Sequence, residues 1–174
     1  DARRVGRLGV IVEPDRFSTG LIVGRFDPPH LGHSYMIEWA AARTDRLVVF
    51  VNSSTERDTA PGELRAAWLS ELHPEVVVLE VQHRLGTDFD DDELWDKWMA
   101  LFREHWPHEA GPHVVFSSDV YVVELAQRFD ARHVVVDADR TTVPISATQI
   151  RENPAAHLDL LAPRIRAWVE ATWL

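Results

Sequence analysis

The sequence contains no cysteine, which excludes disulfide frameworks, thiolate nucleophiles and cysteine-based metal sites. A reducing, cytoplasmic compartment is the expectation that follows. No segment approaches the ~20 consecutive apolar residues that a membrane span needs, so we expect no membrane partner. Positive charge is also scarce, since 18 Lys and Arg stand against 28 Asp and Glu, for a formal net charge of −10. This balance argues against a nucleic-acid partner and means that a polyphosphate would need a local cluster of cations.

The sequence also has no internal repeat, no low-complexity linker and no signal-peptide pattern. Its 174 residues suit one domain that buries a sizeable core. The first residue is Asp1 rather than methionine, as expected of a processed or excised segment. We expect residues 1–20 to form an N-terminal arm of uncertain structure and residues 21–174 to form the functional domain.

Apolar runs alternate with helical patterns along the chain. Five runs lack polar alternation and are expected to be strands covered on both faces, at Leu21–Phe26, Leu47–Asn52, Val76–Val81, His113–Phe116 and His133–Asp137. Helices are expected at Gly32–Arg43, Gly62–Leu72, Asp91–His105, Asp119–Phe129, Thr148–Glu152, Pro154–Leu160 and Pro163–Thr172. The alternation predicts a single α/β domain: a doubly wound, Rossmann-like parallel sheet with C-terminal helices and with ligands at the carboxyl ends of the strands.

The strongest functional signal is the stretch Gly24-Arg25-Phe26-Asp27-Pro28-Pro29-His30-Leu31-Gly32-His33. A strand that stops at a turn and restarts as a helix leaves unpaired backbone N–H groups and the positive end of the helix dipole at one place. His30 and His33 can donate ring N–H bonds to phosphate oxygens from one side, and Gly32 allows a ligand to approach the backbone. Solvated turn histidines are the ordinary alternative. Zinc is disfavoured because no further ligand joins the pair at a recognisable spacing.

The block His30-Leu31-Gly32-His33 resembles the HxGH signature of the nucleotidylyltransferase superfamily. A second block, residues 145–151 (Ile-Ser-Ala-Thr-Gln-Ile-Arg), resembles its ISSTxxR signature, with alanine in place of one serine. Between about Leu21 and Trp168 the chain further resembles the adenylyltransferase domain of NadR-type proteins, which make NAD from nicotinamide mononucleotide and ATP. Five segments carry this likeness. The first holds Arg57, residues 61–65 and Trp68, and the second holds residues 88–91 and Trp95. The other three are residues 116–121, 134–140 and 143–146. The P-loop of a NadR kinase domain and the DNA-binding module of some NadR regulators are not found in this sequence.

Nucleotidyl transfer needs positioning and charge neutralisation more than a strong base, because the attacking acceptor phosphate is already an anion. We expect His30, His33 and Arg151 to be the catalytic residues, with the planar guanidinium of Arg151 on the β- and γ-phosphates. Ser146 and Thr148 are expected to donate hydroxyl bonds at a second helix start, with Thr148 close to the N-cap. The expected nucleotide-binding set is Gly24, Arg25, Phe26, Gly32, Ser117, Asp137, Arg140, Ile145, Ser146 and Thr148.

Asp27, Arg57 and Trp95 are the residues expected to bind the acceptor. The resemblance implies that Trp95 stacks on a pyridine ring, with a core position as an equal alternative, whereas Trp98 is expected in the core. Asp27 stands where many NadR-type sequences carry an aromatic residue, and its carboxylate would repel an anionic acceptor unless Arg25 or the helix dipole compensates.

No protein-bound metal is expected, and Mg²⁺ is expected to bind through the phosphates and water. The acidic run at 88–92 is interpreted as a solvated helix start rather than a cation site. The remaining histidines have no motif partner and are interpreted as structural; they are His73, His83, His105, His108, His113, His133 and His157.

These features predict an enzyme that transfers AMP from ATP to nicotinamide mononucleotide, yielding NAD and pyrophosphate. One alternative is an enzyme of the same fold, CTP-dependent or not, that acts on another phosphorylated or phosphonylated acceptor. A second alternative is a module that binds ATP or NAD without turnover. The expected partners are small molecules, and a homo-oligomer is left open.

Overall fold

The computed structural model describes residues 4–5, 11–12 and 16–174. Near the N-terminus, β1 (Arg4–Val5) pairs with β2 (Ile11–Val12) in a short antiparallel ladder. Most of the arm expected over residues 1–20 lies outside the described residues. Residues 17–20 are different, because they form the first half of the central strand of the main sheet.

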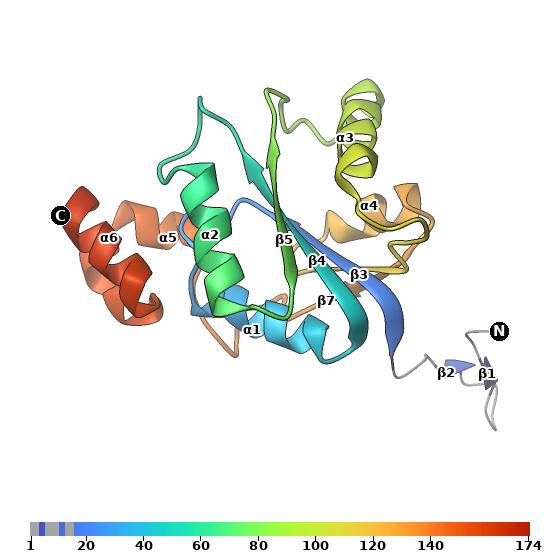
Figure 1. The fold of residues 1–174 in the computed structure, drawn as a ribbon, viewed down its shortest axis with the longest axis horizontal. Helices are drawn as coiled ribbons and strands as arrows, with labels where there is room; N and C mark the ends of the chain where they lie inside the picture. Colours follow the sequence, from blue (N-terminus) through green and yellow to red (C-terminus); the bar gives the residue numbers. More distant parts are fainter. Residues whose placement is uncertain (1–3, 6–10, 13–15) are drawn as a thin grey trace.

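The main sheet has five strands in the order β5-β4-β3-β6-β7, and all four neighbouring pairs are parallel. The central strand β3 pairs with β4 on one side and β6 on the other, so that Ile22 lies between Val49 and Phe116. The expected doubly wound parallel sheet is thereby confirmed (Figure 1). Its strands are β3 (Phe17–Gly24), β4 (Thr44–Ser53), β5 (Val77–Gln82), β6 (Val114–Ser117) and β7 (Arg132–Val135).

Strand β3 starts and ends earlier than the sequence suggested. It begins at Phe17 instead of Leu21, because Thr19 is buried and its hydroxyl bonds the His113 ring at 2.6 Å. Polar residues thus belong to a strand that was expected to be apolar throughout. The strand ends at Gly24, and Phe26 lies beyond it with a φ of 52°.

Seven helices follow the expected order within residues 16–174. Helix α4 begins at Val122 rather than Asp119, because the Ser117 hydroxyl accepts a bond from the Asp119 N–H and holds residues 117–119 in a turn. The segment expected as a helix at 154–160 is a 3₁₀ helix. The bounds are α1 (Leu31–Ala41), α2 (Gly62–Leu72), α3 (Asp92–His105), α4 (Val122–Arg128), α5 (Ala147–Glu152), η2 (Pro154–Leu160) and α6 (Pro163–Trp173).

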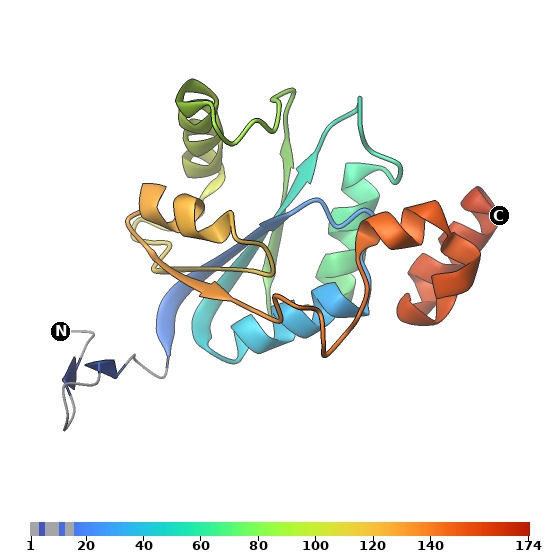
Figure 2. The ribbon, with the colours of Figure 1, turned by 180° about the vertical axis from the view of Figure 1, so that it is seen from behind.

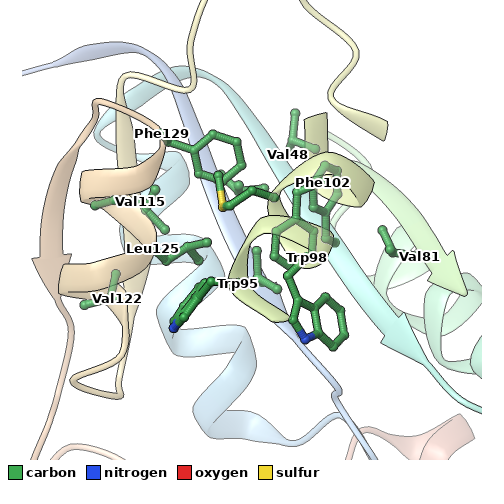
Figure 3. Packing of buried hydrophobic residues seen from close by; sticks show 14 residues of the cluster. Val48, Val81, Trp95, Trp98, Phe102, Val115, Val122, Leu125 and Phe129 are labelled. Carbon is green, nitrogen blue, oxygen red and sulfur yellow. The ribbon is translucent and has the colours of Figure 1, made fainter. Parts of the chain in front are cut away.

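Each face of the sheet packs on a different helix pair, because side chains alternate along a strand. Leu21 and Phe50 belong to a core cluster with residues of α3 and α4. Ile22 and Val49 belong to the opposite cluster, with residues of α1 and α2. Figure 3 shows the first cluster, in which Trp95 of α3 lies toward Leu125 of α4 and Trp98 lies on the other side of α3.

A third apolar cluster joins the C-terminal helices to the sheet layer. Trp68 of α2 packs with Ile150 of α5 and with Ile165 and Val169 of α6. Figure 2 shows α5 and α6 beside α2. Helix α5, which carries Arg151, is therefore fixed to the domain through α2.

The strand order places a ligand-binding position at the centre of the sheet. The chain leaves β3 toward β4 and β5 and then returns to β6 on the other side of β3. At such a reversal the two connections diverge, and the carboxyl ends of β3 and β6 leave a crevice between them. None of the helices in the described residues is long and apolar enough to span a membrane.

Candidate active site

A cavity with a volume of about 380 Å³ lies at the carboxyl ends of the strands. Its wall contains residues 23–27 at the end of β3, residues 117–119 at the end of β6, and His83 directly after β5. Helix α1 contributes both histidines of the first motif, counting the His30 cap, and α5 contributes Thr148 and Arg151. The cavity is therefore at the expected switch point of the sheet.

His30 and His33 bond the backbone of the turn between them and stack on each other. His30 is the N-cap of α1, and its Nδ1 accepts bonds from the N–H groups of Gly32 at 3.0 Å and His33 at 3.3 Å. The Nδ1 of His33 accepts from the His30 N–H at 3.1 Å. In both neutral rings the proton consequently resides on Nε2. The ring centroids are 3.6 Å apart.

Both imidazoles are held in the neutral form. Burial, aided by the charge of Arg140, lowers the pKa of His30 from 6.5 to about 3. Burial also lowers the pKa of His33 well below its ordinary value, with His30 and Arg140 adding to the effect. The Nε2 of His30 is buried and has no hydrogen-bond partner among the described residues. A buried donor of this kind is satisfied by an anionic oxygen of a ligand.

Gly32, the glycine of the first motif, leaves room for the ring of His30. A Cβ at Gly32 would lie 2.8 Å from Cε1 and 2.9 Å from Nδ1 of His30. Any side chain here would displace the capping imidazole. The expected role of Gly32 in close ligand approach is replaced by this packing role, since Gly32 is not in the cavity wall.

The second motif is organised by Ser146, which is the N-cap of α5. Its hydroxyl accepts from the Gln149 N–H at 3.2 Å, and the Gln149 side chain accepts from the Ser146 N–H at 2.9 Å. Thr148, expected near the N-cap, lies inside the helix, where its hydroxyl accepts from Nη2 of Arg151 at 3.2 Å. Ile145 is buried in the third apolar cluster, so its side chain belongs to the core and not to the nucleotide site.

The loop after β7 separates two residues that were expected to act together. Arg140 lines the cavity, has a φ of 52°, and donates from Nη1 to the Ile145 carbonyl at 3.0 Å. Asp137 does not line the cavity. Its carboxylate accepts from the N–H groups of Thr141, Thr142 and Val143 and so fixes the loop that carries Arg140. In this structure the Asp137 carboxylate holds its own loop, and its expected contact with the nucleotide stays a prediction.

Asp27 is in the cavity wall, but its carboxylate is fully buried at 0% exposure and turned to the protein. Its oxygens accept from the Thr59 N–H at 2.9 Å, the Thr59 hydroxyl at 2.8 Å and the Ala60 N–H at 2.9 Å. The carboxylate expected beside the acceptor thus holds the loop after β4. Arg25 and Arg57 also line the cavity, and Nη2 of Arg25 donates to the Arg57 carbonyl at 2.9 Å.

Two tryptophans of α3 supply an aromatic wall. Trp95 is only 5% exposed, lines the cavity, and donates its indole N–H to the Phe89 carbonyl at 2.9 Å. Trp95 is therefore a core residue (Figure 3) that also lines the cavity, and its stacking on a pyridine ring stays a prediction. Trp98 lines the cavity as well, and the His83 ring lies 4.3 Å from its ring, centroid to centroid.

Several residues of the cavity wall are not among the site residues predicted from the sequence. Trp98 and His83 were interpreted as structural, and Phe89 and Tyr121 were not singled out as site residues. Tyr121 donates to the Val23 carbonyl at 2.8 Å, and burial raises the pKa of its hydroxyl to about 12. The periodicity of α3 places Trp95 and Trp98 on one face, which was the one clue available.

The acidic run is a helix start in the structure. Asp91 is the N-cap of α3 and accepts from the N–H groups of Glu93 and Leu94. Asp88 accepts from the Asp90 N–H at 3.0 Å. Within residues 16–174 and the two short strands before them, no group of three or more His, Asp or Glu side chains could hold a metal ion.

A sequence model of the cytidylyltransferase-like family matches residues 21–153, which include both histidines and Arg151. The chain belongs to this family. The resemblance to HxGH nucleotidylyltransferases is confirmed by that match, and the motif residues meet in one cavity as the family assignment requires.

Relatives of this cytidylyltransferase-like chain include NAD-related enzymes. A probable nicotinate-nucleotide adenylyltransferase of Cereibacter sphaeroides is 30% identical over 165 residues, which cover 86% of each protein. The trifunctional NAD biosynthesis/regulator protein NadR of Escherichia coli is 23% identical over 186 residues, 95% of this chain and 44% of NadR. A crystal structure of NadR protein in complex with NR matches with a TM-score of 0.57 and 26% identity, over 81% of this chain and 41% of that one. The chain spans less than half the length of the NadR proteins that it matches.

Proposed function

We propose that the chain transfers the adenylyl group of ATP to nicotinamide mononucleotide, giving NAD and pyrophosphate. One observation carries the proposal: a buried, neutral imidazole with an unpartnered Nε2–H lies in the same cavity wall as Arg151 and Trp95. A phosphate site and a surface for a flat ring therefore share one cavity. The cytidylyltransferase-like family supports the reaction type, and short matches to two nicotinamide-nucleotide adenylyltransferases, of Aeropyrum pernix and Saccharolobus solfataricus, support the acceptor.

In the proposed reaction an oxygen of the acceptor phosphate attacks the α-phosphorus of ATP. A new P–O bond forms while the bond from the α-phosphorus to the bridging oxygen breaks, and pyrophosphate leaves with the electron pair. The attacking phosphate is already an anion near neutral pH, so no side chain has to remove a proton. The protein contributes alignment and neutralisation of the charge that grows on the leaving group.

The two imidazoles and Arg151 fit that task. Each Nε2–H of His30 and His33 donates to a triphosphate oxygen without carrying charge itself, since the pKa values of both rings are lowered. Arg151 supplies the positive charge, and its planar fork can bond two oxygens. The further cavity residues that complete this nucleotide side are Arg140, Ser146 and Thr148.

ATP enters this proposal as its magnesium complex. The carboxylates of Asp27 and Asp58 in the cavity wall bond Thr59 and Arg65 and are not grouped for a cation. Mg²⁺ is accordingly expected to be held by phosphate oxygens and water.

Nicotinic acid mononucleotide is a second candidate acceptor. The observation in its favour is the Cereibacter sphaeroides relative, which matches over most of both chains and is named for that activity. The two acceptors differ only in a carboxamide against a carboxylate, so the same cavity can be tested with both.

The experiment is a pyrophosphate-release assay with each nucleoside triphosphate, Mg²⁺ and a panel of acceptors. The panel holds nicotinamide mononucleotide, nicotinic acid mononucleotide and other phosphorylated or phosphonylated small molecules. We expect the highest kcat/KM with ATP and nicotinamide mononucleotide, with NAD as the product. A preference for the nicotinate form or for CTP would replace the acceptor or the nucleotide in the proposal. Tight binding of ATP and NAD with no turnover would assign the chain to a sensing role instead.

A further inference from the structure

Arg65 of α2 is the largest fully buried side chain, at 0% exposure, and all its donors reach groups at the edge of the cavity. Its Nε donates to the Ala60 carbonyl at 2.9 Å, and its Nη2 donates to Asp58 at 2.5 Å. Its Nη1 donates to the carbonyls of Asn52, at 3.1 Å, and of Arg25. One guanidinium thus joins the ends of two strands to the loop between β4 and α2.

These four partners lie on one side of the site. Arg25, Asn52 and Asp58 line the cavity, and Ala60 ends the loop that carries Arg57. The same end of that loop is also held by Asp27, which accepts from the N–H groups of Thr59 and Ala60.

The nucleotide side is organised separately. His30 and His33 are fixed by the backbone at the start of α1, and Arg151 is fixed by Thr148 and the Asp27 carbonyl. The hydrogen bonds of Arg65 go to the carbonyls of Ala60, Arg25 and Asn52 and to the Asp58 carboxylate, and not to any of these three side chains. A change at Arg65 would therefore act first on the wall formed by Arg25, Arg57, Asn52 and Asp58.

A contribution to folding stability does not explain why a buried guanidinium lies at this position. Removing two charges from water costs energy that the attraction to Asp58 only partly returns, and buried ion pairs are often replaced by apolar side chains without loss. Arg65 also departs from the pattern of α2, whose other buried side chains at Trp68 and Leu69 are apolar. The better explanation is that the geometry of its hydrogen bonds serves the cavity.

We propose that Arg65 is a positioning residue that sets the acceptor side of the cavity, through the Arg25 and Asn52 carbonyls and the Asp58 carboxylate. This inference rests on the proposed function. Arg65 does not contact substrate; it fixes the direction in which Arg25 and Arg57 present their charges to the acceptor phosphate. The four separate bonds need the planar fork of arginine, which the single ammonium of lysine cannot reproduce.

The test compares Arg65→Lys with wild type in steady-state kinetics, and Arg164→Lys on the surface serves as the matched control. Arg164 lies at the start of α6, is exposed, and donates to the Glu71 carboxylate of α2 outside the cavity wall. Because displacing reacting groups by about 1 Å can cost on the order of 10²-fold in rate, we expect kcat/KM for nicotinamide mononucleotide to fall about that much in Arg65→Lys. The KM for ATP is expected to stay within about twofold of wild type, and Arg164→Lys should match wild type throughout.

A purely structural role would move both substrates together, so equal losses for ATP and the acceptor would overturn the proposal. An unchanged KM and kcat for the acceptor in a folded Arg65→Lys protein would overturn it as well. If wild type itself forms no NAD from nicotinamide mononucleotide, the proposed function fails, and this inference fails with it. The wild-type measurement therefore tells the two failures apart.

A second variant keeps the test decisive if Arg65→Lys does not fold. The double variant R65Q/D58N removes both charges and leaves no lone buried carboxylate. Calorimetric titration of this variant with nicotinamide mononucleotide and, separately, with a non-hydrolysable ATP analogue is expected to show at least tenfold weaker binding of the first alone. Equal weakening of both ligands, or of neither, contradicts the assignment of Arg65 to the acceptor side.

Discussion

Nη1 of Arg151 donates to the backbone carbonyl of Asp27 at 2.6 Å, although the two residues are 124 positions apart in the sequence. This bond ties the second motif to the turn that precedes the first. It also fixes one nitrogen of the guanidinium, while Nη2 bonds Thr148. The arginine is thus oriented before any ligand arrives, and a pre-oriented cation stabilises developing charge without reorganisation.

His33→Ala is expected to lose turnover and keep its fold. Removing one preorganised donor typically costs ~10²–10³ in rate, and the ring of His33 lies at the cavity. The measurement is kcat with ATP and nicotinamide mononucleotide, together with thermal unfolding. His157→Ala, in η2, is the control and should behave as wild type. Near-normal turnover in His33→Ala would remove the histidine motif from the mechanism.

The free energy of unfolding is expected to decrease as the pH is lowered through the range between the ordinary and the folded-state pKa of His30. Its pKa is 6.5 in an ordinary environment and about 3 in the folded chain, so between these values the unfolded state binds a proton that the folded state does not. His30 alone should then decrease the free energy of unfolding by about 1.4 kcal/mol for each pH unit below about 6, and His33, whose pKa is lowered as well, adds to this decrease. Urea unfolding at pH 7 and pH 5 measures this, and His30→Gln should show a smaller decrease. A pH dependence identical in wild type and His30→Gln would contradict a buried neutral imidazole.

Arg151→Ala is expected to raise the KM for ATP and lower kcat together, because one guanidinium holds both ground-state and leaving-group phosphates. We expect kcat/KM for ATP to fall about 10²-fold and Arg151→Lys to recover only part of the loss, since a point charge lacks the fork. Arg46→Ala, exposed on β4, is the control. Unchanged ATP kinetics would mean that the triphosphate is held elsewhere.

Trp95→Ala is expected to weaken nicotinamide mononucleotide binding about tenfold, because stacking on a ring is worth ~1–3 kcal/mol and each ~1.4 kcal/mol is a decade. Trp95 is also a core residue, so this variant should lose about 3–5 kcal/mol of stability. Trp95→Phe keeps an aromatic ring and separates the two effects. Calorimetric titration measures binding, with Trp106→Phe, outside the cavity wall, as the control. Equal weakening of acceptor and ATP analogue would count against stacking.

Asp27→Asn is expected to destabilise the protein rather than improve acceptor binding. An amide in place of the carboxylate would turn a donor toward the N–H groups of Thr59 or Ala60, and bonds to charged groups contribute about 1.5–3 kcal/mol. Urea unfolding should show a loss of about 2 kcal/mol, whereas Asp45→Asn on the surface should show little change. Tighter binding of nicotinamide mononucleotide at full stability would mean that the carboxylate faces the acceptor.

The sheet and the two motifs could be predicted because their signals are local or simple. Apolar runs without polar alternation identify strands that are buried on both faces, and the alternation of strands with helices predicts a parallel topology. The carboxyl ends of such strands then bring the first motif and Arg151 to one edge. Strand β3 was predicted too short because burial of Thr19 depends on His113, a partner 94 positions away.

The partners of the loop residues could not be predicted in the same way. Spacing suggested that Asp27, Asp137 and Ile145 bind ligands, but spacing does not say which way a side chain turns. Asp27 and Asp137 bond backbone N–H groups of their own loops, and Ile145 packs in the third apolar cluster. Trp98 was missed for the opposite reason: a ring in the core can also form the wall of a cavity.

Through the third apolar cluster the C-terminal helix supports the helix that carries Arg151, although α6 itself does not line the cavity. Ile150 precedes Arg151 and packs with Ile165 and Val169 of α6, on the side of α2 that carries Trp68. A cavity opened in that packing would leave the sheet and the histidine turn in place and would loosen the helix that aims Arg151. Substitutions at Val169 should thus be detected as weakened nucleotide affinity in a protein whose main cooperative unfolding is little changed.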